Sequence, residues 1–175
     1  MGANPRGEDM TTEEHEFLDR LAISDVIARY CDRLDAHDID AVAALFTNDA
    51  QTDYGPGRGG SVVGREAIRE RLARGQSAFR RTHHQVGHST IDVMGDGAAG
   101  TSAAMTWHER FSGERELLAL RYIDKFVRSE NRWLISYRRA EISLVEGFTG
   151  TEWNWWPRNP PTYPETDEEV RQMPA

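Results

Sequence analysis

The sequence predicts an α+β domain in which three N-terminal helices pack on a strongly curved, mostly antiparallel sheet. In the first half of the chain, apolar residues recur at helical spacing in three segments. After Thr82, four strand-like runs follow one another, separated by short turn sequences. The 175 residues, 38% of them hydrophobic, suffice for one sizeable core. Helices followed by an antiparallel meander are typical of domains whose helices cover one face of the sheet, so we expect its concave face to form a pocket.

The first two predicted helices follow a polar lead-in. Residues 1–11 contain glycine and proline, and we expect them to be a disordered N-terminal tail. A helix is predicted from Thr12 to about Leu34, with acidic residues in its first turn and apolar residues at helical spacing. Asp38 is a suitable cap for a second short helix over residues 39–46.

Residues 51–64, "QTDYGPGRGGSVVG", indicate a short strand followed by a flexible glycine-rich loop. The glycines lack the spacing of a phosphate-binding loop and no strong strand precedes them, so this segment does not predict nucleotide binding. A third, amphipathic helix is predicted over residues 65–79.

The strands of the sheet are predicted from residue alternation and from the turns "GDG", "SGE" and "SEN". The α+β domain should therefore end near residue 146. The remaining residues, 147–175, contain three of the five tryptophans and five of the seven prolines, which indicates an irregular segment. We interpret it as a lid or a subunit contact, the alternative being a docked tail. The predicted strands cover residues 83–94, 98–111, 116–128 and 132–145.

The composition disfavours several classes of partner. A formal charge of −8, with no basic stripe, disfavours nucleic acid and anionic membrane surfaces. No apolar run approaches the ~18 residues that span a bilayer, and the N-terminus lacks the apolar region of a signal peptide. The single cysteine, Cys31, has no partner for an internal disulfide and fits a small core residue. We expect a cytoplasmic protein.

Three of the six histidines fall within the stretch "RRTHHQVGHSTIDV". On a strand, His84 and His88 share one face, whereas His83 points the other way. Strand positions four apart are separated by roughly 13 Å, which is too far for one tetrahedral zinc ion, so no metal is expected. Acid–base chemistry fits better, because histidine titrates near neutrality and needs only a carboxylate to orient it. The best carboxylate is Asp35, at the end of the first helix.

The segments "ISDVIARYCDRLDAHDIDAVAALFTNDA", "VVGREAIRERL", "THHQVGHSTIDV" and "RYIDKFVRSENRWLISYRR" carry a family resemblance. Together they resemble the SnoaL-like and scytalone dehydratase-like branch of the nuclear transport factor two-like superfamily over about residues 13–145. The resemblance implies a cone-shaped α+β barrel. It is less specific for the reaction, because this fold hosts dehydratases, dehydrochlorinases, cyclases, isomerases and binding proteins.

The resemblance also implies site residues. Asp35 matches the aspartate and His84 the histidine that together remove a proton from substrate in the dehydratase and dehydrochlorinase members. His88 falls where many relatives carry an asparagine, and "WHERF" resembles the segment with a second functional histidine, here His108. Further implied matches are the orienting tyrosine of "TDYG", the tyrosine of bile-acid dehydratase-like relatives and a cavity arginine, which correspond to Tyr54, Tyr30 and Arg138.

Other positions depart from scytalone dehydratase. Leu34 replaces the tyrosine before the aspartate, and Leu120 and Tyr122 replace a cavity serine and asparagine, so scytalone itself is not the expected substrate. Tyr122, Trp107 and Phe126, with the tyrosines above, suit an apolar or aromatic ligand, although each aromatic residue taken alone fits a core position as well.

These observations predict a cofactor-independent lyase, most closely a dehydratase, acting on a hydroxylated aromatic, polycyclic or polyketide-like molecule. In this mechanism His108, Tyr30 or Tyr54 donates to the departing hydroxyl and Arg138 steadies the developing negative charge. One alternative is an isomerase or polyketide cyclase with the same Asp–His pair, and another is a non-catalytic small-molecule-binding module. The resemblance and the apolar residues on both faces of the strands predict a homodimer or homotrimer.

Overall fold

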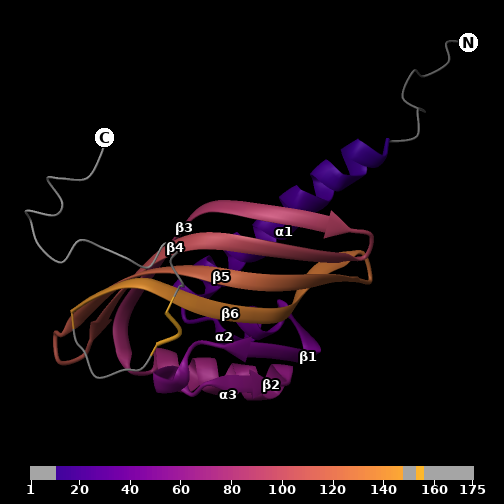
Figure 1. The fold of residues 1–175 in the computed structure, drawn as a ribbon. Coiled ribbons are helices and arrows are strands. Elements are labelled where there is room, and N and C mark those ends of the chain that lie inside the picture. The colour runs from indigo at the N-terminus through magenta and orange to yellow at the C-terminus, as the bar shows by residue number, and fades with distance from the viewer. Residues whose placement is uncertain (1–10, 148–152, 156–175) are drawn as a thin grey trace, which may run out of the picture.

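The computed structural model describes residues 11–147 and 153–155 (Figure 1). It is an α+β fold with one six-stranded sheet, in which four long strands follow the helices as predicted. The elements are α1 (Thr12–Asp35), α2 (Ile39–Ala43), β1 (Phe46–Asp53), the 3₁₀ helix η1 (Pro56–Arg58), β2 (Ser61–Val63), α3 (Arg65–Gln76), β3 (Phe79–Met94), β4 (Gly97–Arg110), β5 (Arg115–Ser129) and β6 (Arg132–Gly147).

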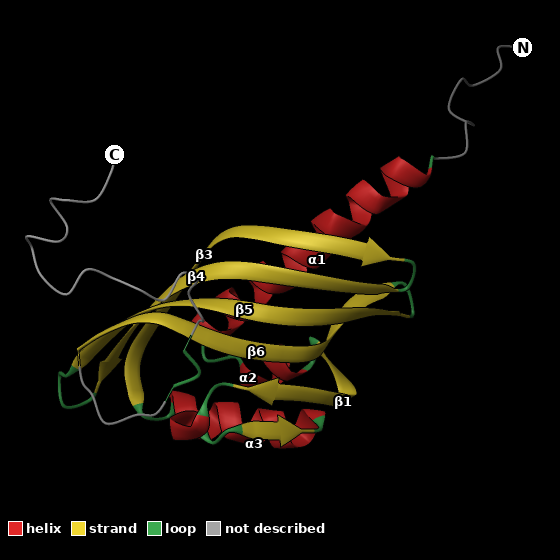
Figure 2. Ribbon diagram, in the orientation of Figure 1, coloured by secondary structure: helices red, strands yellow, loops and turns green. Residues whose placement is uncertain are grey.

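The expectation that all helices precede the sheet is only partly correct. The strand order is β2-β1-β6-β5-β4-β3, so two strands from between α2 and α3 complete one side of the sheet (Figure 2). All neighbours are antiparallel except β1 and β6, which are parallel. The second helix is also shorter than predicted, because Phe46 is fully buried at the start of β1 rather than at the end of α2.

Helix α1 begins with a capping box. The Thr11 side chain accepts a hydrogen bond from the Glu14 backbone N–H, and the Glu14 carboxylate accepts one from the Thr11 N–H, so Thr11 belongs to the helix cap rather than to the predicted tail. The other residues of that tail, 1–10, lie outside the described residues. The N-terminal half of α1 projects past the sheet (Figure 1). Its C-terminal half packs in the core through Ile23, Val26, Ile27, Tyr30, Cys31 and Leu34.

Tight turns join the four long strands. Between β5 and β6, Glu130 and Asn131 both have positive φ, of 49° and 61°, as a two-residue hairpin of the favoured twist requires. Gly95 and Gly113, with φ of 64° and 91°, serve the other two hairpins. The predicted meander and its turns are therefore confirmed.

A β-bulge interrupts the pairing of β3 with β4. Val86 pairs with Ala104 and Ser89 with Ser102, so two residues of β3, Gly87 and His88, lie opposite one residue of β4. Beyond this bulge, inward and outward positions on β3 exchange relative to a simple alternation. No helix within the described ranges is long and apolar enough to cross a membrane.

Candidate active site

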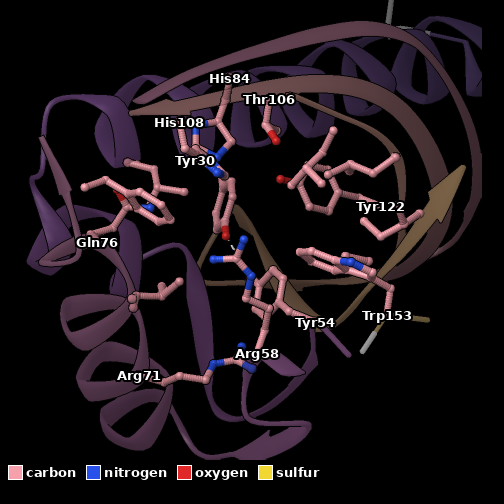
Figure 3. Close-up of a pocket in the computed structure, with 18 residues that line it drawn as sticks. Tyr30, Tyr54, Arg58, Arg71, Gln76, His84, Thr106, His108, Tyr122 and Trp153 are labelled. Carbon is pink, nitrogen blue, oxygen red and sulfur yellow. Dashed lines mark hydrogen bonds between the residues drawn. The ribbon is translucent and has the colours of Figure 1, made fainter. Parts of the chain in front are cut away.

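The concave side of the sheet, α1 and α3 enclose a cavity of about 120 Å³ (Figure 3). Its wall is largely apolar, with the polar groups of two histidines, three tyrosines and two arginines. Of the predicted site residues, those that line it are Tyr30, Tyr54, His84, His108 and Tyr122.

Asp35 and His84 form a hydrogen-bonded pair at the cavity wall. The distance from His84 Nδ1 to Asp35 Oδ1 is 2.6 Å, within the range expected for such a pair. The His84 backbone N–H also donates to Asp35 Oδ2 at 2.7 Å, and the Thr82 hydroxyl donates to Oδ1 at 2.7 Å. Strand β3 therefore holds the last residue of α1 by three hydrogen bonds.

The electrostatics of this pair assign the tautomer of His84. Partial burial disfavours ionisation of Asp35, but the hydrogen bonds from His84 and Thr82 outweigh it and hold the pKa of Asp35 below its usual value. An ionised carboxylate only accepts hydrogen bonds, so His84 Nδ1 carries a hydrogen. In the tautomer of a neutral ring that has its hydrogen on Nδ1, the Nε2 lone pair can accept a proton.

A second histidine–carboxylate pair lies beside the first. His108 on β4 is directly opposite Glu116 on β5, and its Nδ1 donates to Glu116 Oε1 at 2.5 Å. The same oxygen accepts a hydrogen bond from Arg58 Nη2, also at 2.5 Å. The rings of His84 and His108 are 5.3 Å apart.

His108 is neutral and incompletely satisfied. Burial lowers the pKa of His108 below its ordinary value of 6.5, although the hydrogen bond to Glu116 opposes that shift. Its Nε2 is buried and has no hydrogen-bond partner among the residues that the structure describes. A buried polar atom of this kind is a candidate for contact with a ligand.

Tyr30 and Tyr54 also form a pair. Their hydroxyl oxygens are 2.7 Å apart, and burial raises the pKa of both phenols. One hydroxyl donates to the other, which leaves a single hydroxyl hydrogen available to the cavity.

Arg138, for which the sequence predicted a contact with substrate, is not among the residues that line the cavity. The guanidinium is fully buried, with the Tyr30 and Tyr122 rings 4.1 and 4.3 Å away. Its Nε and Nη2 each donate to a carboxylate oxygen of Asp124 at 2.8 Å. Asp124 neutralises Arg138, and the rings of Tyr30 and Tyr122 lie between Arg138 and the cavity. Arg138 therefore supports these two tyrosines of the cavity wall.

Three predicted substrate-binding residues also lie elsewhere. His88 is exposed, because the bulge at Gly87 and His88 turns it away from the face that His84 occupies. Trp107 is on the outer face of β4, 6.0 Å from Arg115, since it alternates with the inward-facing His108. Phe126 is 1% exposed and packs in the core. The His83 side chain is exposed, and its Nδ1 is 3.8 Å from Asp35 Oδ2.

Sequence reasoning missed Glu116 and Arg58. Glu116 could have been recognised from the sequence, because the predicted "SGE" turn places it opposite His108 on the neighbouring strand. The role of Arg58 could not be recognised from the sequence, because a single arginine in a glycine-rich segment resembles an ordinary loop residue. That segment is not a featureless loop, since residues 56–58 form a 3₁₀ helix.

Only residues 153–155 of the predicted lid segment are described. Trp153 lines the cavity, 4.9 Å from the Arg58 guanidinium. The Asn154 carbonyl accepts a hydrogen bond from the Ile142 N–H at 2.7 Å, which fixes this piece against β6. Residues 148–152 and 156–175 lie outside the described residues.

Comparisons with known proteins agree with this architecture. The family model for the SnoaL-like domain matches residues 15–139. No curated protein matches the chain. Among solved structures, a proposed scytalone dehydratase from Novosphingobium aromaticivorans has a TM-score of 0.79 at 22% identity, covering 84% of this chain and 99% of its own.

Two further structures are similar. A Mycobacterium tuberculosis protein of unknown function has a TM-score of 0.69 at 26% identity, covering 78% of each chain. A hexachlorocyclohexane dehydrochlorinase from Novosphingobium barchaimii has a TM-score of 0.70 at 16% identity, covering 81% of this chain and 98% of its own. Because the family model spans both the helical half and the meander that carry the two histidine pairs, the chain belongs to the SnoaL-like domain family.

Proposed function

We propose that the protein is a cofactor-independent lyase, a dehydratase that acts on a hydroxylated aromatic, polycyclic or polyketide-like molecule. The observation that carries this proposal is the 2.6 Å hydrogen bond that leaves His84 Nε2 as a base at the wall of a mostly apolar cavity. Two similar folds support an elimination, since one belongs to a dehydrochlorinase and one to a proposed dehydratase.

The elimination needs one base that also returns its proton. His84 Nε2 takes a proton from a carbon next to an electron-withdrawing or conjugated group. The electron pair of that C–H bond first passes to the electron-withdrawing group, and then forms the new double bond as the C–O bond on the neighbouring carbon breaks. The imidazolium then gives its proton to the departing hydroxyl, so that water leaves and His84 is neutral again. Asp35 stabilises the transient imidazolium.

His108 and the tyrosine pair orient the substrate. His108 is neutral and its Nδ1 hydrogen is held by Glu116, so it accepts a hydrogen bond at Nε2 rather than donating a proton. The hydroxyl hydrogen that Tyr30 and Tyr54 leave free is available to the departing oxygen. Their raised pKa values mean that they donate a hydrogen bond and keep the proton.

The cavity limits the size of the substrate. A volume of about 120 Å³ is close to that of cavities of roughly 150 Å³ that hold one benzene ring. A substrate with one ring fits without rearrangement, whereas a polycyclic one requires the side chains at the opening, such as Trp153, to move.

An isomerase is the second candidate, favoured by the proximity of the His84 and His108 rings, 5.3 Å apart. In an isomerisation, His84 Nε2 removes a proton from one carbon and, as the imidazolium, returns it to another, while the adjacent His108 Nε2 accepts a hydrogen bond from the substrate. Product mass separates the two reactions, because isomerisation conserves mass and dehydration loses one water.

The test is His84→Gln, assayed by mass spectrometry with a panel of hydroxylated aromatic and polyketide-like substrates. We expect kcat/KM to fall by about 10² to 10⁴, with secondary structure unchanged by circular dichroism. His88→Gln is the matched control, since His88 is an exposed histidine of the same strand that the bulge turns away from the face of His84. Equal activity of both variants would exclude His84 as the base.

A further inference from the structure

Arg58 is held at the opening of the cavity by a closed loop. Gly55 and Gly59, on either side of η1, have φ of 94° and 90°, which only glycine adopts without strain. The Gly60 N–H donates to the Gly55 carbonyl at 2.9 Å, and Arg71 Nη1 donates to the Gly60 carbonyl at 3.1 Å. The loop therefore presents Arg58 from a fixed backbone.

The Arg58 side chain reaches into the cavity between aromatic rings. Its guanidinium carbon is 4.9 Å from the centre of the Trp153 ring and 5.6 Å from that of Phe79, which in turn stacks on His108 at 4.5 Å. Figure 3 shows this side chain among the groups that line the pocket. The guanidinium is thus in the same compartment as the second histidine pair.

Arg58 still has hydrogen-bond donors to offer. Nη2 donates to Glu116, but Nε and Nη1 have no hydrogen-bond partner among the described residues, and 24% of the side chain is exposed. A guanidinium held by one nitrogen keeps two others in a fixed orientation for an oxygen atom of a ligand.

The other two arginines near the cavity are less suited to this contact. Arg138 is covered by tyrosine rings and paired with Asp124. Arg71 has Nη1 on the Gly60 carbonyl and Nη2 on the Thr52 hydroxyl, and its guanidinium lies 4.1 Å from the Tyr54 ring. Of the three, Arg58 alone combines free donors with partial exposure inside the cavity.

We propose that Arg58 binds the substrate oxygen that becomes negatively charged when His84 removes the proton. This rests on the proposed function and gives Arg58 the role that the sequence assigned to Arg138. Glu116 partly neutralises Arg58, so the group it takes is a neutral carbonyl oxygen that turns into an enolate oxygen during the reaction. No carboxylate is among the described residues lining the cavity, and the nearby Asp35 and Glu116 are each hydrogen-bonded to a histidine that does line it.

The test uses 4-nitrophenol, whose phenolate carries the negative oxygen of an enolate and whose visible absorbance reports ionisation. It is titrated into the full chain beside 4-nitroanisole, a neutral analogue of similar shape. We expect the wild type to bind the phenolate in preference to the neutral phenol. In Arg58→Gln, phenolate affinity should fall by about 10-fold to 100-fold and 4-nitroanisole affinity by less than about twofold. Arg58→Lys should retain part of the phenolate affinity.

Arg74→Gln is the matched control, because it removes the same charge from an exposed site on α3. It should bind both probes as the wild type does. The proposal is wrong if the wild type shows no preference for the phenolate, or if Arg58→Gln weakens both probes equally. Binding does not depend on turnover, so His84→Gln should keep the phenolate preference. If His84→Gln keeps full turnover, the proposed function fails while the probes still report on Arg58.

Discussion

At the scale of single residues, the site consists of two histidines that are each held at Nδ1 by a carboxylate. The pairs differ in their surroundings: Asp35 is 21% exposed, whereas Glu116 is fully buried. Burial keeps His108 neutral, and the contact of Glu116 with Arg58 fixes the pair, so that His108 Nε2 can accept a hydrogen bond. In the proposed reaction the proton is taken up by the other pair, that of His84, whose carboxylate is partly solvated.

This difference gives a prediction for stability. Because burial lowers the pKa of His108 below 6.5, the unfolded chain binds a proton at pH values where the folded chain does not. The free energy of unfolding should therefore fall as pH decreases from about 7 toward the folded pKa, by at most ~1.4 kcal/mol per pH unit for this group. Urea unfolding at several pH values measures the slope.

His108→Gln should flatten this slope relative to the wild type. Gln85→Ala, at an exposed position of β3 that carries no titrating group, should leave the slope as it is. Equal slopes in the wild type and His108→Gln would mean that His108 takes up its proton equally in both states.

The residue scale also shows what sequence could and could not predict. Asp35 and His84 were predicted because helix end, strand alternation and family motif agree on their placement, whereas Tyr30 and Tyr54 were named by the resemblance alone and their pairing was not predicted. His88 was misplaced because the pattern of alternation carries no sign of the bulge at Gly87. The resemblance named Arg138 as a cavity arginine, and only the fold shows that Asp124 and two tyrosines surround it.

At the scale of elements, the long α1 and the meander were predicted well because their periodic patterns are long and their turns specific. Only a short strand was predicted where β1 lies, because the sequence of β1, "FTNDAQTD", is mostly polar. It is held in the sheet by parallel pairing with β6 and by the buried Phe46, Ala50 and Thr52, which are properties of the whole fold. The same non-local pairing places η1, and with it Arg58, at the cavity.

At the scale of elements, the prediction concerns residues 153–155, the segment that carries Trp153. We propose that its indole closes the apolar side of the cavity, because it lines the wall and contacts Arg58. Trp153→Ala should weaken 4-nitroanisole binding about 10-fold, as expected for losing roughly 1.5 kcal/mol or more of apolar contact. Isothermal titration calorimetry measures it.

Trp155→Ala is the control for this change, since that side chain is 59% exposed. It should bind 4-nitroanisole as the wild type does. If both variants bind like the wild type, the segment does not act as a cover for the cavity.

At the scale of the whole molecule, the two faces of the sheet differ in what covers them. The concave face is occupied by the helices and the cavity. On the outer face, the strand register places Met105, Ala119 and Leu144 side by side across β4, β5 and β6. Met105 and Leu144 are 48% and 46% exposed, so this row is an apolar surface that water covers in a single chain.

We propose that a second copy of the chain covers this row, so that the protein is at least a dimer in solution. Size-exclusion chromatography with light scattering should give at least twice the 19.9 kDa of one chain. Ala119→Arg places a charge in the middle of the row and should shift the mass to that of one chain, because burying an unpaired charge opposes association. Glu70→Arg, which also adds positive charge but on exposed α3, should leave the mass unchanged. A wild-type mass of one chain at micromolar concentration, or an Ala119→Arg variant that still associates, would show that this row is not the interface.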